Sequence, residues 1–380
     1  MNDNQFMRTM LAGGTLSSYS TISANALALT PTSRFTLDGD VGYRKFWGGT
    51  EGVTQTESIS AGFNAHYESW GKLSDDRNWL DSRFRQSSTA VAVLNDLGLA
   101  TNAHGNIDRT MVGGGIQRGL SALDLISVSA TSAITTYNPT SSGTEFLDTS
   151  AIASWRRRIS PLTTLSATSQ FEWLHYNTTP ISNLLIFRNT AGFDTNITQI
   201  LSYGGSVGVA YTNAQVGTAP VSPLATTLTA RNAAGSTVGF IADAHAIYRI
   251  LKNTTLNLFV GQTVAPSVIG NLTKRTTLHA GVTQIINSYS NISLAGDMSR
   301  QTSAGVTNDF LAGSLSYNYE LAREWNASLT YRYLHRTATT GGAVLLDPVT
   351  GLPISGPGPA SSNSVMLVVS KSTTIIPLEH

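Results

Sequence analysis

The residues best suited to chemistry in this sequence are a serine flanked by glycines. Gly204-Gly205-Ser206-Val207-Gly208 has the spacing of a serine-hydrolase nucleophile elbow, which places the serine on a sharp turn between a strand and a helix. The next residues, Val209-Ala210-Tyr211, continue a strand-like run and give no sign of a helix. We therefore expect Ser206 to be a small residue on a strand, and we predict that the chain is not an enzyme.

Metal, thiol and nucleotide chemistry have weaker support. The chain has no cysteine, and the glycine run 113–115 is not followed by a helix that could bind a phosphate. The histidines lie singly, without the i, i+4 spacing of a metal site. Apart from His380 at the end of the sequence, they are His66, His104, His175, His245, His279 and His335. We predict no cofactor and no metal site.

The densest charge lies in Trp155-Arg156-Arg157-Arg158. In an extended strand, Arg156 and Arg158 would share one face and Arg157 would point to the other. Two interpretations stay open. The pair could favour anionic solutes from inside a channel, or the run could anchor a turn at lipid headgroups.

Composition excludes several classes of protein. The 380 residues carry 24 Lys+Arg against 23 Asp+Glu, so the net charge of +1 offers no field for nucleic acid. Only 12% of residues are charged, and Ser and Thr make up about a quarter of the chain. No apolar stretch approaches the ~18 residues of a membrane-spanning helix. The chain is therefore predicted to fold without membrane helices and without binding nucleic acid.

Alternation of apolar and polar residues is the strongest pattern, and it predicts strands with two different faces. It recurs in segments 35–44, 59–68, 164–173, 238–249 and 325–333. The segments run about 10 to 14 residues, which suits a tilted crossing of a bilayer better than an ordinary globular strand. Aromatic residues gather near the segment ends, as in the girdles of membrane barrels. They are Trp47, Trp70, Trp155, Trp173, Trp325, Tyr137, Tyr176, Tyr248, Tyr319 and Tyr333.

Connections between the segments alternate in length. We expect short ones at 119–124, 160–163, 200–204, 251–254, 287–291 and 321–324, and long ones at 138–147, 213–236 and 338–363. Short periplasmic turns and longer outer loops are typical of outer-membrane barrels. The predicted fold is all-β: a transmembrane up-and-down antiparallel β-barrel of about 16 strands (16–18), in the bacterial outer membrane and in contact with its lipid and lipopolysaccharide.

The strand count depends on two segments. Sixteen strands follow if 79–97 is one long strand, and eighteen if it folds back and 15–29 is also a strand. We divide the chain into an N-terminal segment at 1–33, a barrel at 34–376, and terminal residues 377–380 that resemble a cloning scar leading into a histidine tag. The N-terminal segment could be a leader, a tail or an extra strand.

The polar face carries acids and bases in nearly equal number, so we expect a hydrated interior with little overall charge preference. A barrel of 16 to 18 strands is too wide for side chains to fill. The predicted lumen-lining residues are Asp38, Asp40, Arg44, His66, Glu68, Arg156, Arg158, Glu172, Asp243, His245, Arg249, His279, Asp297, Glu320 and Arg332. Asp194, Arg188 and Arg300 are assigned to the same face. Loops 213–236 and 338–363 are candidates to fold inward.

The hairpins resemble one another, with Arg118, Arg158 and Arg249 each preceding a short turn and a new strand, and the segment from Asp75 to Asp81 leads into Arg83 and another strand. In these units the chain resembles the outer-membrane β-barrel porins associated with exopolysaccharide export systems of proteobacteria, over about residues 34 to 376. The resemblance implies a conduit for sugars or a polysaccharide, and it carries over no catalytic residues.

Three functions remain open on this evidence. The first is a porin-like channel for hydrophilic solutes, and the second is an exopolysaccharide export port that works with periplasmic partners. The third is a non-conducting scaffold or adhesin barrel. A homo-oligomer is compatible with each.

Overall fold

The computed structural model describes residues 16–47, 57–71, 76–89, 93–94, 100–101, 105–137, 145–177, 181–216, 235–266, 272–303, 306–337, 345–346, 353–354 and 359–372. Within them, seventeen long strands form one sheet. These are β1 (Leu16–Thr30), β2 (Ser33–Trp47), β3 (Glu57–Trp70), β4 (Arg77–Thr89), β7 (Gly105–Gly119), β8 (Asp124–Tyr137), β9 (Phe146–Arg158), β10 (Thr163–Tyr176), β11 (Ile181–Asn196), β12 (Leu201–Val216), β13 (Gly235–Leu251), β14 (Thr254–Pro266), β15 (Leu272–Asn287), β16 (Ser290–Ser303), β17 (Val306–Ala322), β18 (Trp325–Arg336) and β21 (Ala360–Lys371). Four two-residue strands form two separate pairs, β5 (Val93–Leu94) with β6 (Ala100–Thr101) and β19 (Leu345–Leu346) with β20 (Pro353–Ile354).

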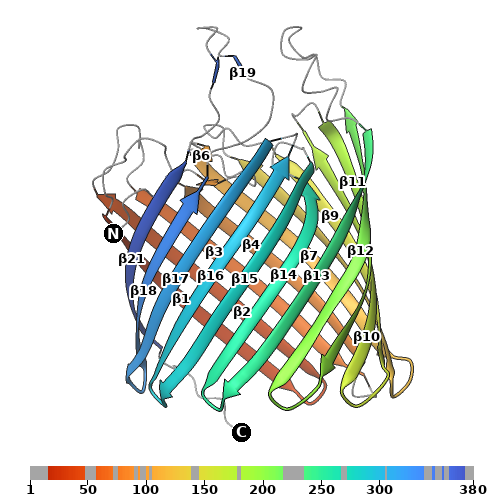
Figure 1. The fold of residues 1–380 in the computed structure, drawn as a ribbon, viewed down its shortest axis with the longest axis horizontal. Helices are drawn as coiled ribbons and strands as arrows, with labels where there is room; N and C mark the ends of the chain where they lie inside the picture. Colours follow the sequence, from red (N-terminus) through yellow and green to blue (C-terminus); the bar gives the residue numbers. More distant parts are fainter. Residues whose placement is uncertain are drawn as a thin grey trace.

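Each long strand pairs antiparallel with the next long strand along the chain, from β1 to β21. The tilted strands curve round into a barrel-like wall, with the N-terminal strands behind and the C-terminal strands in front (Figure 1). The fold is thus the expected all-β, up-and-down architecture, with seventeen strands inside the expected range of 16 to 18. No helix occurs among the described residues, and so none that could cross a membrane.

The seventeenth strand is β1. Residues 16–30 belonged to the expected N-terminal segment, but they pair with β2 over fifteen consecutive positions, from Leu16 opposite Trp47 to Thr30 opposite Ser33. An odd number of alternating strands makes β1 and β21 run in the same direction. The N-terminal end of the sheet therefore lies at the end with the long connections, and its C-terminal end lies at the end with the short turns (Figure 1).

Four of the short turns share one local device, a hydroxyl that accepts hydrogen bonds from the backbone. The Ser121 side chain accepts from the amides of Leu123 and Asp124, at 3.2 and 3.0 Å. Thr30, Ser160 and Thr198 do the same in their own turns. Such Ser and Thr turns satisfy amides that no strand partner reaches. Ser and Thr residues therefore stabilise hairpin turns as well as lining the strands.

Most of the expected connections are confirmed, and some boundaries shift. The turn expected at 200–204 lies at residues 197–200, and Gly204 is inside β12. β12 continues to Val216, beyond the expected start of a loop at residue 213. The segment 79–97 does not turn near Gln86, because β4 runs through that residue to Thr89. The final strand spans Ala360–Lys371, and residues 373–376, also expected in it, lie outside the described residues.

The bend of the sheet defines an inner and an outer face. Glu172 on β10 and Arg188 on β11 share one face, and the Arg188 guanidinium reaches the backbone of β14, which is three strands away along the sheet. Such a contact is possible only on the concave side, so we call this the inner face. Cross-strand register then assigns each of the remaining strand residues to the inner or the outer face.

The outer face is apolar. Its large side chains are left uncovered by the protein: Ile22 is 81% exposed, Val238 73% and Leu367 69%. Trp155, Trp173 and Trp325 lie on this face near strand ends, as a girdle requires. The girdle prediction is wrong for Trp70 and Tyr176. Trp70 lies two positions after Glu68 and therefore on the inner face. Tyr176 lies four positions after Glu172, so it also points inward, and it is 4% exposed.

Candidate functional site: the inner wall of the barrel

The inner face is lined by hydroxyl, amide and charged side chains. Hydroxyl pairs bridge neighbouring strands at Thr131 and Ser150 (2.7 Å) and at Ser316 and Thr330 (3.1 Å). Such pairs satisfy one hydroxyl with another and leave lone pairs for water. The inner wall can therefore be hydrated without leaving its polar groups unpaired.

Register places all fifteen predicted lumen-lining residues on this inner face. The chain of partners from Asp38 through Asn64 to Arg83 illustrates how neighbouring strands continue one face. The same tracing places Asp194 and Arg188 on the inner face. Arg300 is a correction: it lies three positions after Asp297, and a period of two puts it on the outer face, where its guanidinium pairs with Asp309 at 2.8 Å.

Polar contacts organise the inner wall of β1 to β4. His66 Nδ1 lies 2.6 Å from an Asp81 carboxylate oxygen, and Arg77 lies 3.4 Å from Glu68. The amides of Asn25 and Asn64 both donate to the carboxylate of Asp38. These charged side chains bind one another and so hold the strands in register at this wall.

Ser206 pairs with an acid, and no contact among the described residues joins it to a histidine. Its hydroxyl donates to Asp243 on β13, and His245 forms its ion pair with Asp194 at 3.1 Å. Ser206 lies within β12, which continues on both sides of it, as the strand interpretation predicted. A second Asp–His pair, His279 with Asp297 at 2.7 Å, lies on β15 and β16. No group of three metal-ligating side chains occurs among the described residues.

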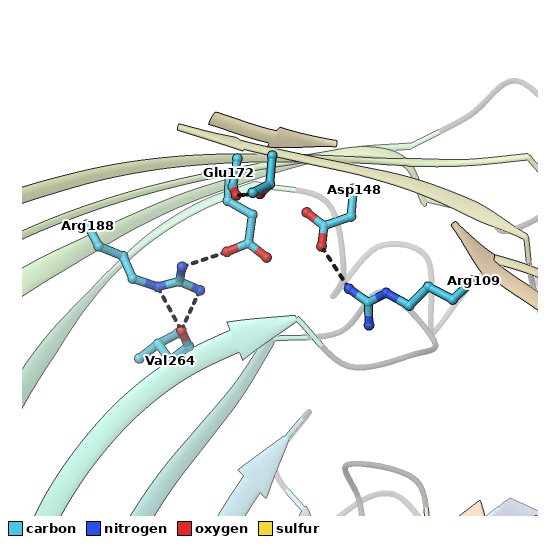
Figure 2. A network of polar contacts seen from close by, with 7 residues as sticks. Arg109, Asp148, Glu172, Arg188 and Val264 are labelled. Carbon is cyan, nitrogen blue, oxygen red and sulfur yellow. Dashed lines mark hydrogen bonds and ion pairs between the residues drawn. The ribbon is translucent and has the colours of Figure 1, made fainter. Parts of the chain in front are cut away.

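A network at the loop end bends β14 inward. Arg188 donates to Glu172 at 2.6 Å and to the carbonyl oxygen of Val264 at 3.1 and 3.3 Å (Figure 2). Asp148 lies beside Glu172 and pairs with Arg109 at 3.8 Å. Because Val264 belongs to β14 and Arg188 to β11, the end of β14 must pass in front of the inner face of β12 and β13.

Apolar packing accompanies this bend. Val264 packs against Ala210 and Ile241, and all three are at most 8% exposed. The side chain of Val264 occupies the space above Gly239, where an added Cβ would lie 2.8 Å from Val264 Cγ2. A second inner cluster, of Leu174, Tyr176, Leu184, Ile186 and Ala214, covers the loop ends of β10 to β12. Part of the interior at the loop end is therefore filled by protein.

The turn end has a different character. An open recess of about 700 Å³ is lined there by amides and hydroxyls, among them Asn291, Asn318, Asn326 and Ser328, with Glu320 as its one acid. The Asn318 side chain donates to that of Asn291 at 2.9 Å. Its amide and hydroxyl groups lie beside apolar side chains such as Ile285 and Val368.

Sequence reasoning missed several inner-wall charges. Arg83 and Arg85 were not assigned to the lumen, and neither were Arg109 and Asp148. The signal was available in the alternation of Asp81, Arg83 and Arg85. The two loops expected to narrow the channel lie largely outside the described residues, and the constriction that is described comes from the end of β14.

Comparison with known proteins finds similar solved structures but no similar sequence. The FrpB iron transporter from Neisseria meningitidis matches with a TM-score of 0.56 at 8% identity, over 92% of this chain and 65% of its own. The copper transporter OprC matches with a TM-score of 0.52 at 10% identity, over 85% and 63%. The siderophore receptor PirA from Acinetobacter baumannii matches with a TM-score of 0.52 at 7% identity, over 93% and 71%. No protein-family model matches the sequence, and no curated protein is similar to it.

At these identities the likeness shows a shared fold, that of bacterial outer-membrane β-barrels. The chain spans 65% of the length of FrpB and 63% of that of OprC. The fold and the apolar outer face agree with the predicted place in a bacterial outer membrane. The narrower resemblance to porins of exopolysaccharide export stays a prediction.

Proposed function

We propose that this chain forms a channel of the bacterial outer membrane through which hydrophilic solutes pass. The observation that carries the proposal is the contrast between the two faces of one continuous sheet. Large apolar side chains such as Val238 cover the outside, whereas charged and hydroxyl side chains such as Asp38 and Ser150 line the inside. Lipid outside and water inside satisfy both surfaces.

The number of strands in the sheet favours a barrel with an open lumen and not one filled by side chains. Sixteen- to eighteen-stranded barrels enclose an aqueous lumen, and seventeen strands lie in this range. The inward end of β14 and the inner apolar clusters occupy the lumen near the loop end only. We therefore propose a narrowed channel and no catalytic role.

Single-channel recording tests this function. The purified protein is inserted into planar bilayers in potassium chloride, and we expect steady, repeated steps of conductance. A folded protein that inserts and stays silent would contradict the channel and favour the scaffold or adhesin barrel. Folding is checked independently by the shift in gel mobility on heating, which reports an intact barrel.

A polysaccharide export port is the second candidate, and the amide-lined recess at the turn end favours it. Amide side chains such as Asn291 and Asn318 can hydrogen-bond to sugar hydroxyls without a charge requirement. If the barrel passes a sugar polymer, neutral oligosaccharides added at the turn end should block the current more strongly than those added at the loop end. Equal block from both sides would contradict this candidate.

A further inference from the structure

Three arginines lie on the inner wall of β4 and β7, and one of them, Arg109, also pairs with Asp148 at the edge of the Arg188 network. Arg83 and Arg85 occupy successive inner positions of β4, and both are exposed. Arg109 on β7 is the direct cross-strand partner of Arg85, and its side chain is 52% exposed. Three arginine side chains therefore start from neighbouring inner positions of two paired strands.

The surrounding acids neutralise this patch only in part. Asp148 on β9 lies 3.8 Å from Arg109, and Asp81 on β4 is held by His66 at 2.6 Å. Asp40 on β2 lies in the same cross-strand row, and its carboxylate occupies the space above Gly62. Within the described part of the chain, Arg83 and Arg85 form no hydrogen bond and no ion pair.

Neighbouring arginines on β4 and β7 do not stabilise the sheet. Like charges directly opposite on neighbouring strands destabilise a sheet, and Arg85 faces Arg109 in this way. Water in the lumen screens the repulsion but supplies no opposite charge. An oxyanion does, because the planar guanidinium forks of two arginines can each donate two hydrogen bonds to it.

We propose that Arg83, Arg85 and Arg109 form a binding site for the oxyanion group of a passing solute, a phosphate or a carboxylate. The site rests on the proposed function to the extent that a solute must reach the inner wall. It gives the channel a local preference for anionic solutes, although the inner wall as a whole is nearly balanced in charge.

The experiment uses inorganic phosphate as the probe and compares three proteins. These are the wild type, R85Q, and R332Q as the matched control. Arg332 is also an exposed inner-wall arginine, but its partners on either side are Ser314 and Ser364, so it stands alone. Phosphate affinity is measured in detergent by calorimetry, and block of the chloride current by phosphate is measured in planar bilayers.

The expected result is a loss of affinity of about tenfold in R85Q, the size of one lost charge-assisted interaction, and no change in R332Q. In phosphate-free buffer R85Q should unfold at a temperature no lower than that of the wild type, because the repulsion with Arg109 is removed. Equal phosphate affinity in the wild type and R85Q would overturn the site, as would an equal loss in R332Q.

The two proposals fail separately. If bilayers stay silent while R85Q alone loses phosphate binding, the channel is refuted and the anion site stands. If channels open but phosphate neither binds nor blocks them, the anion site is refuted and the channel stands. Acetate in place of phosphate identifies the source of the oxyanion: tighter binding of acetate assigns carboxylates, and tighter binding of phosphate assigns phosphates.

Discussion

Replacing Arg188 with methionine should both weaken the barrel and widen its channel. Arg188 makes three hydrogen bonds, one to Glu172 and two to the carbonyl oxygen of Val264. Its side chain is 16% exposed and that of Glu172 is 15% exposed. In Arg188→Met the Glu172 carboxylate stays in place beside Asp148 without its partner, and the end of β14 loses its attachment to β11.

The magnitude follows from burial. Removing one partner of a fully buried ion pair costs about 3–5 kcal/mol, and the partial exposure of this pair lowers our expectation to about 3 kcal/mol. The exposed pair of Arg300 and Asp309 provides the control, because Arg300→Met removes the same side chain from a pair that the protein leaves exposed near the loop end of the outer face. We expect no measurable loss of stability there.

A double substitution separates the two effects. In Arg188→Met with Glu172→Leu, no buried charge is left unpaired, and apolar replacement of a buried pair is often neutral for stability. Stability should therefore recover, whereas the carbonyl of Val264 still has no donor and the end of β14 is still released. The double variant should keep the larger conductance of the single variant.

The assays are urea unfolding followed by tryptophan fluorescence, and single-channel conductance in planar bilayers. An unchanged conductance in Arg188→Met would refute the idea that the inward end of β14 narrows the channel. A conductance that returns to the wild-type value in the double variant would show that instability, and not release of β14, caused the change.

Three further outcomes are expected. Gly239→Ala places a Cβ 2.8 Å from Val264 Cγ2, so it should cost about 1–3 kcal/mol in urea unfolding and raise the conductance. Ala244→Arg puts a charge on the outer face near the middle of β13 and should cost about 2–4 kcal/mol in lipid, and a neutral result would reassign that face to water. Asp243→Asn keeps an acceptor for Ser206, so the heat-induced gel shift should be unchanged, while the reversal potential in a salt gradient should move toward anions.

The period-two pattern was sufficient to predict which face most charged residues occupy. Each strand residue points opposite to its neighbours, so one correct assignment fixes the whole strand. The misplacement of Arg300 came from ignoring this rule over the three positions from Asp297. β1 was harder to assign, because small residues such as Ser23 and Ala24 alternate with little contrast in polarity. Only its register with β2 reveals it as a strand.

Other features depend on contacts between residues far apart in the chain. Arg188 and Val264 are separated by 76 residues, and no local pattern near either one predicts that β14 leaves the wall. Gly204 was expected at the end of the short connection 200–204. It lies inside β12, where a Cβ on Gly204 would collide with the Asp194 carboxylate and approach the His245 ring. That requirement is invisible until three strands are brought together.

Two glycines of the inner wall, Gly204 and Gly62, each leave room for an acid to reach across a strand. Among the described residues, an ion pair forms across Gly204 but not across Gly62. Asp194 on β11 and His245 on β13 are two strands apart, and they meet at 3.1 Å because Gly204 between them has no side chain. Asp40 leans over Gly62 in the same manner toward β4, yet it forms no ion pair with Arg85 among the described residues. The cross-strand partner of Arg85 on β7 is instead a like charge, Arg109. Within the part of the chain that the structure describes, the Arg85 guanidinium therefore has no acidic partner across Gly62. It is available to an anion that enters the channel.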